Sequence, residues 1–172
     1  AFKGRAAAKP LSVLVPGREA LAALGARVPP FAEALAEAFW PGPLTLVLAC
    51  GARLAPGVAR EDGALGLRCS PLPVAAALAR ELFALGAGPL TATSLNRSGE
   101  PPARTRAEAE AVCGEGPEAP WLVAGPDAAG GAPSSVVDAT GAEPVLLREG
   151  ALSAAALFAA LDASTSRFRE IR

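Results

Sequence analysis

Short apolar runs, interrupted by Pro and Gly, constrain the fold of this chain more than any other feature of its sequence. The 17 prolines and 18 glycines help to break every apolar run before it reaches the roughly 20 residues of a membrane-spanning helix. The runs follow one another as residues 11–15, 17–24, 30–39, 44–49, 65–69, 72–85, 88–94 and 103–112. Some of these runs have the continuous apolar pattern of buried strands and others have apolar residues at helical spacing. The two kinds alternate over most of the chain, which predicts an α/β fold.

The last third of the sequence adds a predicted hairpin and a helix. Residues 134–140 and 144–149 are strand-like and are separated by a short turn, so we expect at least one antiparallel pair. Apolar residues at helical spacing over 153–163 predict the final helix. A length of 172 residues fits one domain. We place that domain at residues 1–162, followed by a polar C-terminal tail at 163–172.

The charge balance limits the classes of partner. The chain has 16 basic and 17 acidic residues, a net charge of −1 and a pI near 5.6. This gives no general attraction to nucleic acids or to acidic membranes. We therefore expect a soluble, compact protein in which any anion is recognised by a local pocket.

The absence of histidine excludes several chemistries. Without His, neither a Ser-His nor a Cys-His nucleophile pair can form, so a general base would be a carboxylate, a lysine or the substrate itself. The three cysteines, Cys50, Cys69 and Cys113, are widely spaced and form no CxxC pair. This argues against a zinc site and predicts reduced thiols in a cytosolic protein.

The polar run 91–101, TATSLNRSGEP, is the first candidate binding element. It places Ser94 and Asn96, the only asparagine of the chain, in a loop after a predicted strand. In open α/β sheets the carboxyl ends of strands are where ligands bind. The alternative is a turn in which these side chains bond only to nearby backbone, and the loop taken alone favours that alternative slightly.

Two further positions could bind anions. Ser134 and Ser135 precede VVD at the start of the predicted hairpin, and Arg148 lies near the end of its second strand, so hydroxyls and a guanidinium could meet at one end. The alternative is turn chemistry and a surface arginine. Arg68 lies on an otherwise apolar strand and needs an acidic or anionic partner.

The N-terminal ten residues contain both lysines of the chain, Lys3 and Lys9, together with Arg5. An ammonium is a compact point charge and a guanidinium is a planar fork, so this segment offers two kinds of anion contact. The alternative is a solvated charged terminus, and the segment taken alone favours it.

Several ordered motifs resemble the YrdC-like family of threonylcarbamoyl-AMP synthases. They are KGR and KPL near the N-terminus, WPGPLTLVL, GLRC, TSLNRSGEP, SSVVD and LREG, and they span nearly the whole chain. The resemblance implies a twisted, open mixed α/β sheet with flanking helices around a positively lined cavity. It also implies an enzyme, a nucleotidyltransferase, that joins L-threonine, bicarbonate and ATP into threonylcarbamoyl-AMP and releases pyrophosphate.

The resemblance carries implications for cofactor, partners and location. Mg²⁺ would enter with ATP. The product would pass to a separate threonylcarbamoyl transferase complex that modifies tRNA, in the cytoplasm and without a membrane partner. A weak direct contact with tRNA is left open.

The resemblance also assigns site residues. The positions that match the family's functional residues are Lys3, Arg5, Arg68, Ser94, Asn96, Ser135 and Arg148. Lys3 and Arg5 are implied to be catalytic and, with Ser94, to receive threonine and bicarbonate. Ser94 and Asn96 are implied to orient phosphate or metal, and Arg148 to hold a nucleotide phosphate or sugar. Arg68 and Ser135 are implied to bind ATP and Mg²⁺.

Family members carry a strand, a helix and a P-T-[DE]-T-x-Y-G-L segment before the KGR motif, and this sequence starts after them and lacks tyrosine. We expect an N-terminally truncated sequence, and the alternative is a degenerate homologue. Two other functions remain open. One is the carbamoyl-adenylate-forming domain of hydrogenase-maturation carbamoyltransferases, and the other is a non-catalytic RNA-binding module.

Overall fold

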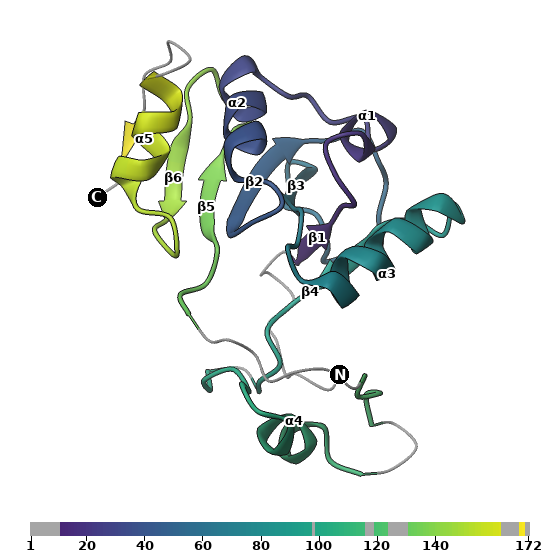
Figure 1. Cartoon of the computed structure of the whole chain (residues 1–172). Helices are drawn as coiled ribbons and strands as arrows, with labels where there is room; N and C mark the ends of the chain where they lie inside the picture. Colours follow the sequence, from purple (N-terminus) through teal and green to yellow (C-terminus); the bar gives the residue numbers. More distant parts are fainter. Residues whose placement is uncertain (1–10, 98, 116–118, 124–130, 163–168, 171–172) are drawn as a thin grey trace. The chain divides into compact units, whose positions relative to one another are not determined.

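The computed structural model describes residues 11–97, 99–115, 119–123, 131–162 and 169–170 (Figure 1). The chain divides into two compact units. The sheet unit comprises Pro10–Ala92 and Ala132–Arg172. The loop unit comprises Ala1–Lys9 and Thr93–Gly131. The expected domain boundary at residue 162 stays a prediction.

The sheet unit contains a seven-stranded mixed sheet with the order β4-β1-β3-β2-β5-β6-β7. Its strands are β1 (Ser12–Leu14), β2 (Leu44–Ala49), β3 (Ala64–Arg68), β4 (Leu90–Ala92), β5 (Ser135–Asp138), β6 (Val145–Arg148) and β7 (Arg169–Glu170). The pairs β1–β3, β2–β5 and β6–β7 are parallel, and the other three pairs are antiparallel. The predicted open mixed sheet and the β5–β6 hairpin are confirmed. The positively lined cavity stays a prediction.

Four helices belong to the sheet unit, namely α1 (Ala20–Ala23), α2 (Pro30–Phe39), α3 (Pro73–Ala84) and α5 (Ala154–Asp162). Helix α2 has Pro30 in its first turn, where the missing N–H costs no helical hydrogen bond, and it buries Phe31 and Leu35. It packs against β2 and α5, whereas α3 packs against β1 and β4 (Figure 1). Both α2 and α3 agree with the predicted ranges within one residue.

The first helix is shorter than the predicted range 17–24. The N–H groups of Ala20 and Leu21 bond to carbonyls three residues earlier, at Gly17 and Arg18, which is the pattern of a turn. Gly25 follows with a φ of 59° and ends the helix. The segment therefore forms a turn and a single helical turn.

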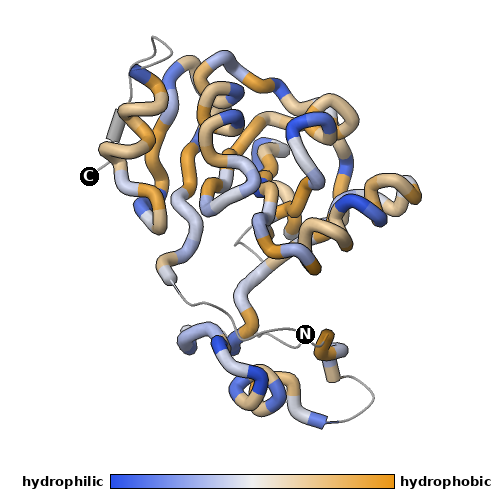
Figure 2. The backbone as a smooth tube through the Cα atoms, in the orientation of Figure 1, coloured by the Kyte–Doolittle hydropathy of each residue, from blue (hydrophilic) through white to orange (hydrophobic). Residues whose placement is uncertain are grey.

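The apolar core of the sheet unit lies around the two central strands. Leu44, Leu46 and Leu48 of β2 and Leu65 and Leu67 of β3 are fully buried. Figure 2 shows the same strands as hydrophobic along most of their length. The alternate residues of β2, Thr45 and Val47, are buried as well, at 3% and 9% exposure. Both faces of β2 are therefore covered, and a polar side chain on this strand needs a hydrogen-bond partner.

The loop unit contains α4 (Arg106–Cys113), which begins with a capping box. Thr105 Oγ1 accepts the N–H of Glu108 at 3.2 Å, and Glu108 Oε2 accepts the N–H of Thr105 at 3.1 Å. Backbone N–H groups of Arg104 and Thr105 hold the pKa of the Glu108 carboxyl below its usual value. Thr105 is the N-cap, so the helix starts at Arg106, three residues after the predicted start.

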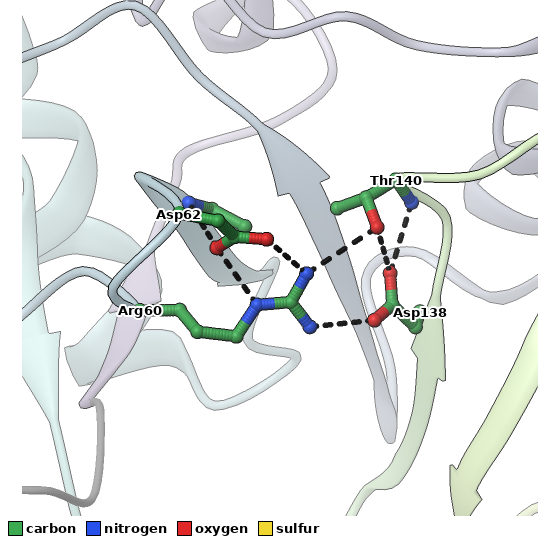
Figure 3. Close-up of polar contacts among 5 residues, drawn as sticks. Arg60, Asp62, Asp138 and Thr140 are labelled. Atoms are coloured by element: carbon green, nitrogen blue, oxygen red, sulfur yellow. Dashed lines mark hydrogen bonds and ion pairs between the residues drawn. The ribbon is translucent and has the colours of Figure 1, made fainter.

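A polar cluster fixes the connection between β2 and β3 to the turn after β5 (Figure 3). Arg60 donates from Nε and Nη2 to Asp62 at 2.8 and 2.6 Å, and from Nη1 to Asp138 at 2.6 Å. Thr140 donates its N–H and its hydroxyl to Asp138 at 2.9 and 2.6 Å. These bonds close one end of the sheet, where β2 and β5 finish.

Among the residues that the structure describes, no helix combines the length and the apolar composition that a membrane crossing requires.

Candidate functional site: the arginine end of the sheet

Strand direction gathers polar residues at the other end of the sheet. Since β3 runs antiparallel to β2 and β6 runs antiparallel to β5, the ends of β3 and β6 lie beside the starts of β2 and β5. Val136 pairs in register with both Thr45 and Arg148. Leu46 pairs with Leu67, so the next residue of β3, Arg68, lies beside Thr45. We call Thr45, Arg68, Ser134, Val136 and Arg148 together the arginine end of the sheet.

Arg68 is the electrostatically unusual member of the arginine end. Its Nε atom is buried and has no hydrogen-bond partner among the described residues. Burial lowers the pKa of this guanidinium, and the nearby charge of Arg148 lowers it further. In the described ranges neither arginine forms an ion pair with a carboxylate. Cations that have no carboxylate partner in these ranges favour an anion, so the expected anion contact of Arg68 and Arg148 stays a prediction.

Arg148 is held by the backbone of Ser134. Its Nε and Nη2 atoms donate to the Ser134 carbonyl oxygen at 3.1 and 2.7 Å, and Nη2 also lies 3.3 Å from Ser134 Oγ. The arginine is exposed, whereas Ser134 is 7% exposed. One side of the guanidinium is therefore fixed to the sheet while the residue remains open to solvent.

Ser135 has a different environment from Ser134. Its hydroxyl donates to the Leu152 carbonyl at 2.6 Å and accepts the N–H groups of Gly150 and Leu152 at 2.9 and 3.0 Å. One donor and two acceptor positions are all that a hydroxyl has. The Ser135 side chain thus fastens the segment after β6 to the start of β5, and its expected contact with ATP stays a prediction.

The WPGP motif forms the corner between α2 and β2 and borders the arginine end. Gly42 donates its N–H to the Cys69 carbonyl at 3.0 Å, and the Pro43 carbonyl accepts the N–H of Ser135 at 2.9 Å. The Trp40 indole donates to the Leu44 carbonyl at 2.9 Å. These bonds join the end of β3 to the start of β5 through the corner.

The other predicted polar element lies in the loop unit. The Ser94 hydroxyl donates to Asn96 Oδ1 at 2.7 Å, and Asn96 Nδ2 donates to the Glu100 carbonyl at 2.6 Å. Asn96 is 9% exposed, so its amide organises the loop from within. The structure therefore brings Ser94 and Asn96 together. It separately brings Arg68, Ser135 and Arg148 to the same end of the sheet.

Two predicted residues, Lys3 and Arg5, lie outside the described residues.

Sequence reasoning missed Thr45, whose Oγ1 lies 2.9 Å from Ser134 Oγ. The available signal was a lone hydroxyl in the apolar strand LTLVLA.

The donor set suits a metal ion only in company with a substrate. In the part of the chain that the structure describes, no group of three His, Cys, Asp or Glu side chains could hold a metal ion. Mg²⁺ commonly binds substrate phosphates and waters with only one or two protein oxygens. The expected entry of Mg²⁺ with ATP therefore stays a prediction.

Comparison with known proteins identifies the relatives of this chain. The Sua5/YciO/YrdC family, described as telomere recombination, matches residues 1–150. A relative from Mycobacterium tuberculosis is 37% identical over 151 residues, which is 88% of this chain and 66% of the relative. The threonylcarbamoyl-AMP synthase of Pyrococcus abyssi is 38% identical over 151 residues, which is 87% of this chain and 42% of that protein. The chain therefore spans less than two thirds of either relative.

A solved structure gives a similar result. The crystal structure of P. abyssi Sua5 complexed with L-threonine superposes with a TM-score of 0.79 at 29% identity. The match covers 99% of this chain and 47% of that chain.

Proposed function

The chain belongs to the Sua5/YciO/YrdC family, and from this premise we propose that it acts as a threonylcarbamoyl-AMP synthase. The observation that carries the proposal is the arginine end of the sheet, where Arg68 and Arg148 end strands at the same end and neither has a carboxylate partner among the described residues. A synthase relative and a threonine-bound structural neighbour support the same activity.

The proposed reaction has two stages. The amine of L-threonine adds to bicarbonate and releases water, which forms an N-carboxylate. An oxygen of that carboxylate then attacks the α-phosphorus of ATP. The bond between this phosphorus and the oxygen that bridges the α- and β-phosphates breaks. The products are threonylcarbamoyl-AMP and pyrophosphate, so every atom of the three substrates is accounted for by the two products and one water.

All three substrates carry negative charge, and the residues of the chain would offset their repulsion. Arg68 and Arg148 would bind anionic groups of the substrates, with Arg148 on a nucleotide phosphate or sugar. Lys3 and Arg5 would neutralise carboxylate and phosphate charge. Positioning and fixed charges can supply most of the rate in such a reaction, and no histidine is needed.

The loop unit would contribute the Ser-x-Asn element. Asn96 would hold the loop and Ser94 would meet phosphate, metal or substrate. Mg²⁺ would enter with ATP and reduce the charge of its phosphates. The product would then serve a tRNA-modifying threonylcarbamoyl transferase complex in the cytoplasm, with at most a weak contact between this protein and tRNA.

Pyrophosphate release from ATP tests the proposal. We expect release only when L-threonine and bicarbonate are both present. Arg148→Ala should reduce kcat/KM by at least about tenfold, because a charged hydrogen bond to substrate contributes about 1.5–3 kcal/mol. The matched control is Arg27→Ala, an exposed arginine whose N–H bonds to Ala49 at the far end of β2.

Two outcomes would each refute one part of the proposal, the first its activity and the second its site. One is release that is triggered by carbamoyl phosphate in place of threonine, which would indicate a carbamoyl-adenylate-forming enzyme. The other is an equal loss of activity in the two arginine variants, which would remove the arginine end from the site.

A further inference from the structure

We propose that Thr45 is a positioning residue for Arg148 and that it acts through Ser134. The inference rests on the proposed function only in the choice of substrate for its test. No motif assigned a role to Thr45, which lies inside the strand that follows the WPGP corner.

The first step is the contact between the two hydroxyls. Thr45 Oγ1 and Ser134 Oγ lie 2.9 Å apart, and the residues are 3% and 7% exposed. Water therefore has little access to compete for either hydroxyl. A buried hydroxyl requires a hydrogen-bond partner, so each of these side chains fixes the orientation of the other.

The second step is the room that the neighbouring strand leaves for Thr45. Gly66 of β3 has no side chain, and a Cβ built there would lie 3.5 Å from Thr45 Cγ2, an ordinary van der Waals contact. The Thr45 methyl group therefore lies beside β3, while its hydroxyl meets Ser134, the residue before β5. A β-branched side chain has few rotamers, so this arrangement holds the hydroxyl in one direction.

The third step connects Ser134 to the arginine. The Ser134 carbonyl accepts two N–H groups of Arg148, and its hydroxyl lies 3.3 Å from Arg148 Nη2. Whatever holds Ser134 in place therefore holds one side of the guanidinium. No hydrogen bond of Arg148 Nη1 occurs among the described residues, and we infer that this nitrogen meets the anion.

Fixation of Arg148 by Thr45 and Ser134 should affect the binding of the anion more than the chemical step. A long arginine side chain loses rotamer freedom when it grips a ligand, and prior fixation reduces that cost. Thr45 does not touch substrate in this arrangement. Its loss should weaken the binding of the anion that Arg148 holds and leave the chemical step nearly unchanged.

The test compares Thr45→Val with Thr45→Ser. Valine keeps the β-branched shape and removes the hydroxyl, whereas serine keeps the hydroxyl and removes the methyl group. We expect Thr45→Val to raise the KM for ATP about fivefold, as for the loss of one net hydrogen bond, with kcat within about twofold. Thr45→Ser should keep the wild-type KM within about twofold. Unfolding midpoints of both variants check that the fold is retained.

A double-mutant cycle with Arg148→Ala locates the effect. If Thr45 acts through this arginine, Thr45→Val should add no further rise of KM in the Arg148→Ala background. The inference is overturned if Thr45→Val binds ATP like the wild type, if its effect is equally large without the arginine, or if Thr45→Ser is as impaired as Thr45→Val.

Failure of the inference and failure of the proposed function are distinguishable. Should the wild type release no pyrophosphate with threonine and bicarbonate, the proposed function fails. The affinity for ATP is then measured by calorimetry on the wild type, the two Thr45 variants, Arg148→Ala and the double variant, and the same pattern of effects decides the inference. A wild type without measurable affinity for ATP overturns both.

Discussion

Replacing Arg60 with alanine should destabilise the sheet unit at neutral pH. The Arg60 side chain joins the β2–β3 connection to the end of β5, because it binds Asp62 and Asp138 at the same time (Figure 3). These pairs differ in exposure. The side chain of Asp62 is 53% exposed, and that of Asp138 is 15% exposed.

The magnitude follows from the exposure of each pair. A solvated ion pair such as Arg60–Asp62 contributes less than about 1 kcal/mol. A hydrogen bond between charged groups that are largely buried, such as Arg60–Asp138, contributes about 1.5–3 kcal/mol. Asp138 keeps two bonds from Thr140 in the variant, so it is not left without partners. We therefore expect a total loss of about 2 kcal/mol, or about 4 to 8 °C in Tm for a chain of this length.

The decrease in the free energy of unfolding caused by Arg60→Ala should depend on pH, and the pKa values of the two carboxyl groups determine the direction. Hydrogen bonds from Arg60 and Ala64 lower the pKa of Asp62 to about 2. Burial raises the pKa of Asp138, but bonds from Thr140 and Arg60 outweigh it, so that pKa is also lowered. A carboxyl with a lowered native pKa adds stability above its unfolded pKa of about 4, and this stability is lost as the pH falls through the native pKa.

Urea unfolding at pH 7, 4 and 3 measures the effect, with Arg53→Ala as the control. Arg53 is an exposed arginine of the same connection. Its replacement should change the free energy of unfolding by no more than about 0.5 kcal/mol. The difference between the wild type and Arg60→Ala should be largest at pH 7 and should narrow below pH 4. Equal stability of the two proteins at pH 7, or a difference that does not narrow in acid, would refute the reasoning.

Two further substitutions test the parts of the candidate site. Asn96→Asp would set a carboxylate oxygen against the Glu100 carbonyl, which now accepts a hydrogen bond from the amide at 2.6 Å. Turnover should fall about tenfold, and unchanged turnover across a Mg²⁺ titration would mean that the loop does not need this donor. Gly150→Ala would push a Cβ into the Pro133 carbonyl and displace the segment that Ser135 fastens. Thermal unfolding should show a loss of about 1–3 kcal/mol, and an unshifted midpoint would contradict the crowding at that glycine.

Most of the secondary structure could be predicted from the sequence, because apolar spacing and Pro or Gly at the boundaries act locally. Helix α2 occupies the predicted residues, and α3 is one residue shorter than its predicted range at each end. The first helix was overpredicted, since hydrogen bonds over three residues and over four residues fit the same apolar spacing. The candidate site could be predicted only in part. The family motifs assigned roles to Arg68 and Arg148. They assigned none to Thr45, whose contact with Ser134 appears only in the structure.

Sequence alone determined the elements of this protein and the kinds of group that can act in it. The absence of histidine and a polar loop around one asparagine are properties of composition and order. Tertiary structure alone decided which of those groups meet. Thr45 and Ser134 are 89 positions apart, and their hydroxyls come within 2.9 Å only because β2 and β5 pair in parallel. Pairing between distant strands depends on register and burial across the whole sheet, and no local stretch of sequence contains that information.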